Sequence, residues 1–205
     1  MDDKELIQKV AEKDHLAFKM LIDRYQTLVL NTCFNFLGNR QNAEDVAQEV
    51  FLQVYKSARK FRHQCLVSTW VYRITVNRCL NFIRDNRRFR WLDSLSRALE
   101  NENQRGQQAL WSSSAYDPEF ALRENETRAL IQKAVTSLPG KQKTMFILNK
   151  YEGLSYQEIA KILDVSLSSV EAGLHRAKSN LQKSLALHFK KIEEGRKLRR
   201  QSRVK

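Results

Sequence analysis

Residues 154–181 read LSYQEIAKILDVSLSSVEAGLHRAKSNL, and this stretch decides the fold of the second half of the chain. Ser155 and Glu158 have the spacing of a capping box, in which each side chain accepts a hydrogen bond from the other residue's backbone N–H at the start of a helix. The residues that follow predict a helix as far as 163, a turn at 164–166 and a second helix over 167–181.

Two helices joined by so short a turn form a helix-turn-helix, whose second helix fits the major groove of DNA. We expect Arg176 to bind guanine or phosphate, and Lys178 to bind phosphate. An ordinary helical hairpin with a solvated face has the same pattern, so the pattern alone leaves both interpretations open. The predicted shared core is Ile159, Leu163, Val165, Val170 and Leu174. The predicted exposed face of the second helix is Ser168, Ser169, Glu171, Ala172, His175, Arg176 and Lys178.

A second unusual segment, residues 59–90, carries 9 basic and 1 acidic side chains, and aromatic residues are interleaved with them. Arginine neutralises phosphates, and aromatic faces stack on unpaired bases at roughly 1–3 kcal/mol per base. The segment therefore suits a DNA strand that is being opened. The alternative is that Trp70 and Tyr72 are core residues of a helix with a basic face.

Helical periodicity extends over the rest of the chain, which has only 6 Gly and 2 Pro among 205 residues. Apolar residues between 6 and 29 recur at spacings of three and four, with a polar interruption around 13–15. Residues 38–40 have the composition of a helix end, and the pattern of residues 43–58 predicts the next helix. A third helix, capped by Ser68 or Thr69, is expected to reach about 88.

The middle of the chain loses this periodicity, because residues 92–116 are polar and of low complexity, as in a linker. Asp117 and Pro118 then have the order of a helix start. We therefore predict an all-α protein with two small helical domains joined by a flexible linker. The predicted parts are a first domain at 1–91, a linker at 92–116, a second domain at 117–188 and a basic tail at 189–205.

Composition limits the other possibilities. The formal net charge is +13 and is concentrated in basic segments, which suits a polyanionic partner such as DNA. Three cysteines without a CxxC motif indicate a reducing cytosol and neither a disulfide framework nor a metal site. No apolar run approaches the ~20 residues of a membrane span, and the amino terminus resembles neither a signal nor a transit peptide. We expect a cytoplasmic protein that is not embedded in a membrane and needs no cofactor.

Several motifs resemble the extracytoplasmic-function (ECF) sigma factors of the sigma-70 family. The strings AEDVAQEVFLQVY at 43–55 and STWVYRITVNR at 68–78 resemble their region 2. The strings DPE at 117–119, LP at 138–139 and GLSYQEIA through HRAK at 153–178 resemble their region 4. The resemblance covers about 1–90 and 117–185, in the order and spacing of the family.

The resemblance implies that the first domain is region 2, which binds the β′ clamp of core RNA polymerase through Asp45, Gln48 and Glu49. This domain would also melt the −10 promoter element and capture a flipped base near Asn77. The residues implied for −10 DNA binding are Trp70, Arg73, Asn77, Arg78, Asn81, Arg84, Arg87 and Arg88.

The second domain would be region 4, which docks on the β flap and reads the −35 element with the 167–181 helix. The linker would run towards the active-site cleft of the polymerase. An anti-sigma protein would hold the factor inactive. The factor itself would catalyse nothing and would bind no small-molecule substrate.

The sequence departs from the family pattern at four positions. Glu171 and Gly173 stand where the family often has a basic residue and an arginine, which predicts an altered −35 readout. His63 replaces a usual glycine and Val67 a usual aromatic residue, which makes the turn before the third helix unusual. The basic tail would add nonspecific DNA affinity, or would be a solvated end.

Two rival functions come from other classes. A stand-alone helix-turn-helix regulator would bind promoter duplex without polymerase, as a dimer on two half-sites. A nuclease would hold Mg²⁺ on Glu44, Asp45 and Glu49, but these carboxylates lie on one helix and no second acidic cluster accompanies them.

Overall fold

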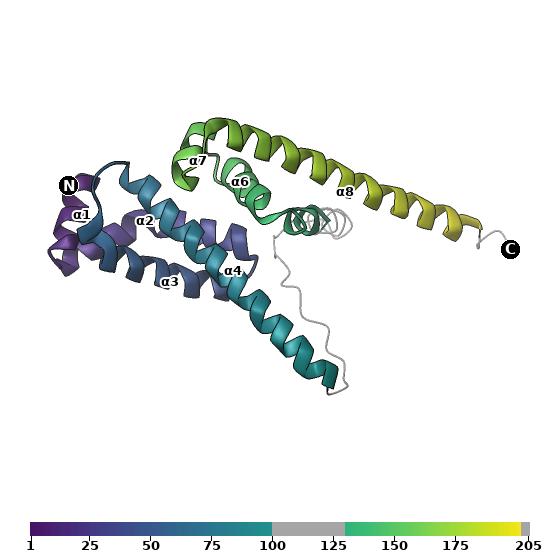
Figure 1. The fold of residues 1–205 in the computed structure, drawn as a ribbon, viewed down its shortest axis with the longest axis horizontal. Helices are drawn as coiled ribbons and strands as arrows, with labels where there is room; N and C mark the ends of the chain where they lie inside the picture. The colour runs from purple at the N-terminus through teal and green to yellow at the C-terminus, as the bar shows by residue number, and fades with distance from the viewer. Residues whose placement is uncertain (100–129, 202–205) are drawn as a thin grey trace, which may run out of the picture. The chain divides into compact units, whose positions relative to one another are not determined.

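A computed structural model describes residues 1–99 and 130–201, and the side chains of 1–86 and 130–186. The chain divides into two compact units, Met1–Leu110 with Lys161–Asp164, and Trp111–Ala160 with Val165–Lys205. The described residues are helical or lie in turns, as the all-α prediction requires (Figure 1). Residues 92–99 of the predicted linker are helical in the structure, which corrects the predicted start of the linker at 92. Residues 100–116 and the helix start at Asp117 lie outside the described residues, and the other predicted domain boundaries stay predictions.

The first unit begins with α1 (Asp3–Ala11) and α2 (His15–Leu37). The polar interruption at 13–15 separates them, because Asp14 caps α2 through hydrogen bonds from two backbone N–H groups. Gly38 ends α2 with a φ of 68°, a left-handed conformation that favours glycine. The predicted break and stop signal are thus both confirmed.

A small polar network fixes α1 to α2. Asp3 accepts hydrogen bonds of 2.5 Å from Tyr25 and from Arg24. Burial alone would raise the pKa of Asp3, but these hydrogen bonds outweigh it and hold the pKa below its ordinary value. Burial and the hydrogen bond to Asp3 raise the pKa of Tyr25 well above its usual range.

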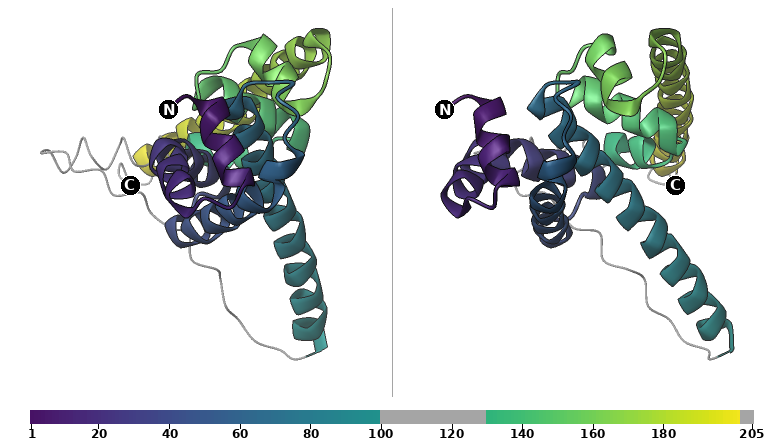
Figure 2. Two further views of the ribbon diagram at one scale, coloured as in Figure 1. Left: turned by 90° about the vertical axis from the view of Figure 1, so that its left-hand side faces the viewer. Right: turned by 60° about the vertical axis from the view of Figure 1, so that its left-hand side comes forward.

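The unit continues with α3 (Arg40–Ser57), the short 3-10 helix η1 (Ala58–Lys60) and α4 (Val67–Leu99). Figure 2 shows α4 as one long continuous helix. It begins before Ser68 and Thr69, so the prediction that either residue caps it was wrong. The backbone N–H of Trp70 already bonds to Leu66 O.

Each of the helices α1 to α4 turns an apolar face inward, and these faces pack together to form the core of the first unit. Helix α3 buries the residues that its periodicity indicated, and α4 packs on both α2 and α3. The fully buried side chains of this core include Leu6, Ile7, Val10, Leu21, Val29, Cys33, Val46, Val50, Val54, Val71 and Cys79.

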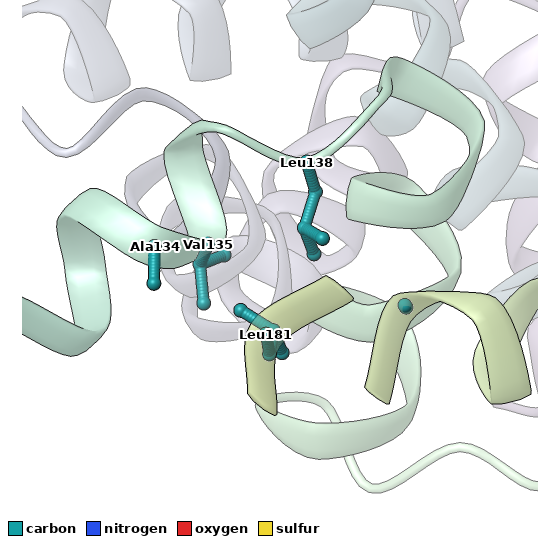
Figure 3. Packing of buried hydrophobic residues seen from close by; sticks show 5 residues of the cluster. Ala134, Val135, Leu138 and Leu181 are labelled. Atoms are coloured by element: carbon teal, nitrogen blue, oxygen red, sulfur yellow. The ribbon is translucent and has the colours of Figure 1, made fainter. Parts of the chain in front are cut away.

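The second unit contains helical residues 130–136, α6 (Gly140–Lys150) and most of the helix-turn-helix. Its helices are short or amphipathic, and they bury a small cluster against α8 (Leu167–Gln201). In Figure 3, Ala134, Val135 and Leu138 lie beside Leu181 of α8. This cluster also includes Ala177, and Phe146 and Leu185 pack on it.

The predicted capping box is confirmed at the start of α7 (Tyr156–Leu163). Glu158 accepts a 2.8 Å hydrogen bond from the Ser155 N–H, and Ser155 Oγ accepts one of 3.3 Å from the Glu158 N–H. Before it, Gly153 turns the chain with a φ of 69°. After α7, the turn uses Asp164 with a φ of 55°, a left-handed conformation that aspartate tolerates better than most residues.

Two predictions for this unit need correction. Val165, predicted in the core, lies in the turn between α7 and α8 and is 38% exposed, whereas Ile162 is buried instead. Helix α8 runs on to Gln201 and so includes most of the predicted basic tail. Likewise α4 continues to Leu99, beyond the predicted end near 88.

Candidate nucleic-acid and polymerase surfaces

One face of α4 carries a stripe of polar and aromatic side chains. With 3.6 residues per turn, positions 70, 73, 77, 81, 84 and 88 fall on one side of the helix. The buried positions Val71, Thr75 and Cys79 fall on the other side. Asn77 and Asn81 are exposed. The periodicity of the helix therefore brings together most of the residues predicted for −10 DNA.

Trp70 lies at the start of this stripe and is half-buried. Its ring centroid is 4.8 Å from that of Phe61, and Phe61 contacts His63 edge-on at the same separation. His63 has a φ of 55°, so the turn before α4 forms with a non-glycine residue in the left-handed region. The ring of Phe61 thus packs against one side of Trp70, while Arg73, one turn farther along the stripe, donates hydrogen bonds from Nε and Nη2 to the backbone oxygen of Lys161.

Arg78 lies at the edge of the stripe and turns towards α3. Its Nη2 donates a 2.8 Å hydrogen bond to Gln53 Oε1, and its Nη1 lies 3.7 Å from Glu49 Oε2. The sequence predicted Arg78 for DNA and Glu49 for polymerase, but gave no signal that the two side chains meet. Gln53 is the residue that sequence reasoning missed here.

Farther along α4, Arg84 is exposed and lies 3.4 Å from its neighbour Asp85. So exposed a pair contributes little energy and leaves the guanidinium accessible. Arg87 and Arg88 belong to α4, but their side chains lie outside those that the structure describes.

The outer face of α3 carries the three residues predicted to bind polymerase. Asp45, Gln48 and Glu49 are all exposed. Leu52 follows at the same helical spacing and is 54% exposed, although it is a large apolar residue. Single exposed leucines are common on protein surfaces, so Leu52 is a candidate contact only because it lies seven residues after Asp45 on the face predicted to bind polymerase.

All seven residues predicted to face DNA on α8 are exposed. The opposite side of the helix is buried at Val170, Leu174, Ala177 and Leu181. Within the part of the chain that the structure describes, Arg176 and Lys178 form no salt bridge. The exposed residues are Ser168, Ser169, Glu171, Ala172, His175, Arg176 and Lys178.

The amino-terminal end of α8 is held by Ser166. Its hydroxyl accepts a 3.2 Å hydrogen bond from the Ser169 N–H and lies 2.8 Å from Ser169 Oγ and 3.0 Å from Ser168 Oγ. Such a cap fixes the direction in which the helix leaves the turn. The two serines predicted to contact DNA are therefore held at the first turn of the helix.

Gly173 does not belong to the exposed face. It is buried where α8 passes α6, and a Cβ atom there would overlap with Sδ of Met145. A side chain at this position would require Met145 to move, and the absence of an arginine removes no side chain from the exposed face, whereas Glu171 does lie on that face.

The carboxylates of the nuclease hypothesis do not form a metal site. Glu44 accepts a 2.8 Å hydrogen bond from Arg40. Across residues 1–99 and 130–201, no group of three or more His, Cys, Asp or Glu side chains is placed to hold a metal ion.

Comparison with protein families places both surfaces in known regions. The sigma-70 region 2 family matches residues 21–89, which include the α3 face and the α4 stripe. The sigma-70 region 4 family matches residues 128–181, which include the helix-turn-helix. The chain is 32% identical to the RNA polymerase sigma-H factor of Pseudomonas aeruginosa over 89% of its own length and 93% of that protein.

The chain belongs to the ECF group of sigma-70 family sigma factors. The ECF sigma factor SigW of Bacillus subtilis is 31% identical over 89% of this chain and 96% of that protein. The ECF sigma-E factor of Escherichia coli K12 is 32% identical over 87% and 91%. The family expected from the motifs is thus confirmed.

Solved structures agree with this sigma-factor fold. CnrH in complex with the cytosolic domain of CnrY superposes with a TM-score of 0.62 at 21% identity, covering 90% of this chain and 97% of that one. The sigma factor RpoE of Bartonella quintana, in complex with the anti-sigma factor NepR, has a TM-score of 0.57 at 17% identity, covering 82% and 96%. No described helix of this sigma factor is long and apolar enough to cross a membrane.

Proposed function

We propose that this sigma factor binds core RNA polymerase and directs it to promoters by reading the −10 element with α4 and the −35 element with α8. The observation that carries the proposal is the pair of surfaces in one chain: the α4 stripe within the region 2 match and the exposed α8 face within the region 4 match. A factor of this kind positions DNA for the polymerase and needs no catalytic residue of its own.

The α3 face is the proposed contact with the β′ clamp. Asp45, Gln48 and Glu49 supply exposed acceptors, and Leu52 supplies apolar surface next to them. Carboxylates at the rim of such a contact guide association, while the leucine loses its contact with water on binding. Region 4 would dock on the β flap through a separate surface.

The α4 stripe suits a single strand leaving the duplex. Trp70 offers an aromatic face, Asn77 and Asn81 offer amide donors and acceptors, and Arg73 and Arg84 neutralise phosphates. We propose that a base of the −10 element is flipped out near Asn77, where exposed amide groups can pair with its edge.

The exposed face of α8 suits duplex DNA. Arg176 is the proposed base or phosphate contact and Lys178 a phosphate contact, since both are exposed on the groove-facing side. Glu171 on the same face favours cytosine, whose amino group donates a hydrogen bond, and disfavours nearby phosphates. The −35 preference of this factor should therefore differ from that of relatives with a basic residue there.

Polymerase makes the two DNA surfaces act together. Each surface is small, and binding of one raises the effective concentration of the other at its DNA element. Arginine–phosphate contacts release counterions, so promoter binding should weaken steeply with salt. We place the factor in the cytoplasm, where polymerase and chromosome are found, and propose an anti-sigma partner because relatives of this fold bind one.

A gel shift with and without core polymerase separates this proposal from the stand-alone regulator. A labelled promoter duplex is titrated with the full chain alone, with core polymerase alone and with both. The proposal predicts a stable, heparin-resistant complex only when both proteins are present. A tight shift by the chain alone, unchanged by polymerase, supports the regulator instead.

A further inference from the structure

We propose that Cys33 and Cys79 form a reversible intramolecular disulfide under peroxide stress, so that region 2 contains a redox modification site in its core. The proposal concerns two buried thiols that neither the polymerase surface nor the DNA surfaces use. It therefore stands or falls independently of the function proposed above.

The geometry brings these two sulfurs together from distant parts of the sequence. Cys33 lies on α2 and Cys79 on α4, two helices that pack directly on each other in the same unit. Their Sγ atoms are 3.7 Å apart, and both side chains are 0% exposed. A disulfide bond is about 2.05 Å long, so the two sulfurs must approach each other by about 1.7 Å from their separation in the structure for the bond to form.

The third thiol provides an internal comparison. Cys65 lies in the segment between η1 and α4 and is half-exposed. An external reagent should therefore react with Cys65 before it reaches the buried pair. Cys33 and Cys79 differ from Cys65 in that each already has another sulfur in contact with it.

The oxidation balances with hydrogen peroxide as the oxidant. One thiolate attacks a peroxide oxygen and becomes a sulfenic acid, while the O–O bond breaks and one water leaves after protonation. The second sulfur then attacks the sulfenic sulfur, the S–S bond forms and a second water leaves. Two thiols lose two electrons and two protons, and one peroxide is reduced to two waters. Because both sulfurs are buried, the oxidant reaches them through local opening of the bundle.

The expected consequence is a covalent connection between α2 and α4. The bond would close the loop from residue 33 to residue 79 and restrict the unfolded chain. It would thus hold α4, with its DNA-facing stripe, on the bundle when peroxide rises. Return of reducing conditions would open the bond again, since cytosolic thiols keep such pairs reduced in the absence of stress.

The test uses the full chain carrying Cys65→Ser, which leaves only the two buried thiols. The protein is treated with hydrogen peroxide, denatured in the presence of N-ethylmaleimide and digested for mass spectrometry. The expected product is a monomer with a peptide pair joined through Cys33 and Cys79, no alkylated cysteine, and recovery of two alkylated cysteines after dithiothreitol. Oxidation should raise Tm by roughly 8–30 °C.

Matched controls are Cys65→Ser with Cys33→Ala and Cys65→Ser with Cys79→Ala, each of which keeps one buried thiol. Circular dichroism checks that both fold, and neither should gain Tm on oxidation. Three outcomes would overturn the proposed bond. Both cysteines could remain open to alkylation after peroxide, the individual sulfurs could be oxidised to sulfinic or sulfonic acids, or only intermolecular disulfides could form. A bond that forms without raising Tm would overturn its stabilising role.

Discussion

Arg78 of α4 donates a 2.8 Å hydrogen bond to Gln53 of α3 and lies 3.7 Å from Glu49 on the same helix. The guanidinium thereby connects the helix proposed to read DNA with the helix proposed to bind the polymerase clamp. Arg78 has a structural role within region 2 in addition to any role on DNA, whereas Asn81 on the open stripe is exposed.

This difference predicts separate effects for Arg78→Ala and Asn81→Ala. Loss of the Arg78–Gln53 hydrogen bond should lower the free energy of unfolding by about 0.5–1.5 kcal/mol, and promoter opening should fall as well. Asn81→Ala should reduce promoter opening and leave stability within ~0.5 kcal/mol of the wild type. Urea unfolding and permanganate footprinting of the −10 region measure the two effects. Equal stability of the variants would contradict the structural role of Arg78.

The α3 face predicts that Asp45→Ala combined with Glu49→Ala weakens binding to core polymerase, by about tenfold if each side chain contributes roughly 0.7 kcal/mol. Fluorescence anisotropy with labelled chain and core polymerase measures the dissociation constant. Glu44→Ala is the matched control, because Glu44 is an exposed carboxylate on the same helix that is not among the residues proposed to bind polymerase. Full binding by the double variant would exclude this face as the clamp contact.

The exposed face of α8 predicts that Arg176→Ala lowers transcription from promoters that depend on a −35 element, by roughly five- to a hundredfold for a contact worth ~1–3 kcal/mol. Lys183→Ala, an exposed basic residue farther along α8, is the control and should have little effect. Transcription in vitro from promoters with and without a −35 element shows whether the loss of activity is specific to −35 recognition. If Arg176→Ala leaves the −35-dependent promoter unaffected, α8 does not read DNA as proposed.

Two glycines of the second unit provide a matched test of the backbone argument. A Cβ atom added at Gly140 or at Gly153 would meet no other atom within 4 Å, but only Gly153 has a positive φ, of 69°. Gly153→Ala should therefore cost about 1 kcal/mol, and Gly140→Ala, at the start of α6, should be neutral or slightly stabilising. Denaturant unfolding followed by circular dichroism measures both. Equal stability of the two variants would contradict this assignment of strain.

The pKa of Asp3 gives the predicted pH dependence of α1 docking. Because this pKa is held below its ordinary value of 3.8, the ionised carboxylate stabilises the fold above that value. The stabilisation disappears as the pH falls through the lowered pKa. Asp3→Asn should therefore reduce Tm slightly near pH 7, since the pair is partly exposed, and make no difference once Asp3 is protonated. A Tm difference that persisted in acid would show that the carboxylate charge is not the cause.

Local signals in the sequence were enough to predict most of the described helices and several of their ends. The Ser155–Glu158 capping box, the stop at Gly38 and the periodicity of α3 depend on neighbouring residues, and the structure confirms each of them. The exposed face of α8 was predictable for the same reason, because its buried side repeats at helical spacing. The cap of α4 was missed, since two polar residues there also fit inside the first turn.

Features that depend on distant residues were not predictable in this way. The meeting of Arg78 with Gln53 and Glu49 depends on how α3 crosses α4. The burial of Gly173 against Met145 of another helix also depends on tertiary packing, so the sequence did not show that this position lies off the exposed face. The contact between Cys33 and Cys79 likewise depends on the packing of α2 on α4.

Transcription in vitro with purified core polymerase and a library of genomic promoter fragments tests the central claim most directly. RNA 5′ ends are mapped with and without the full chain. We expect the chain to create a new set of start sites that share two upstream sequence elements at a fixed spacing, and Arg176→Ala to change the preference at the farther element. Identical start sites with and without the chain would contradict its assignment as a promoter-selecting subunit.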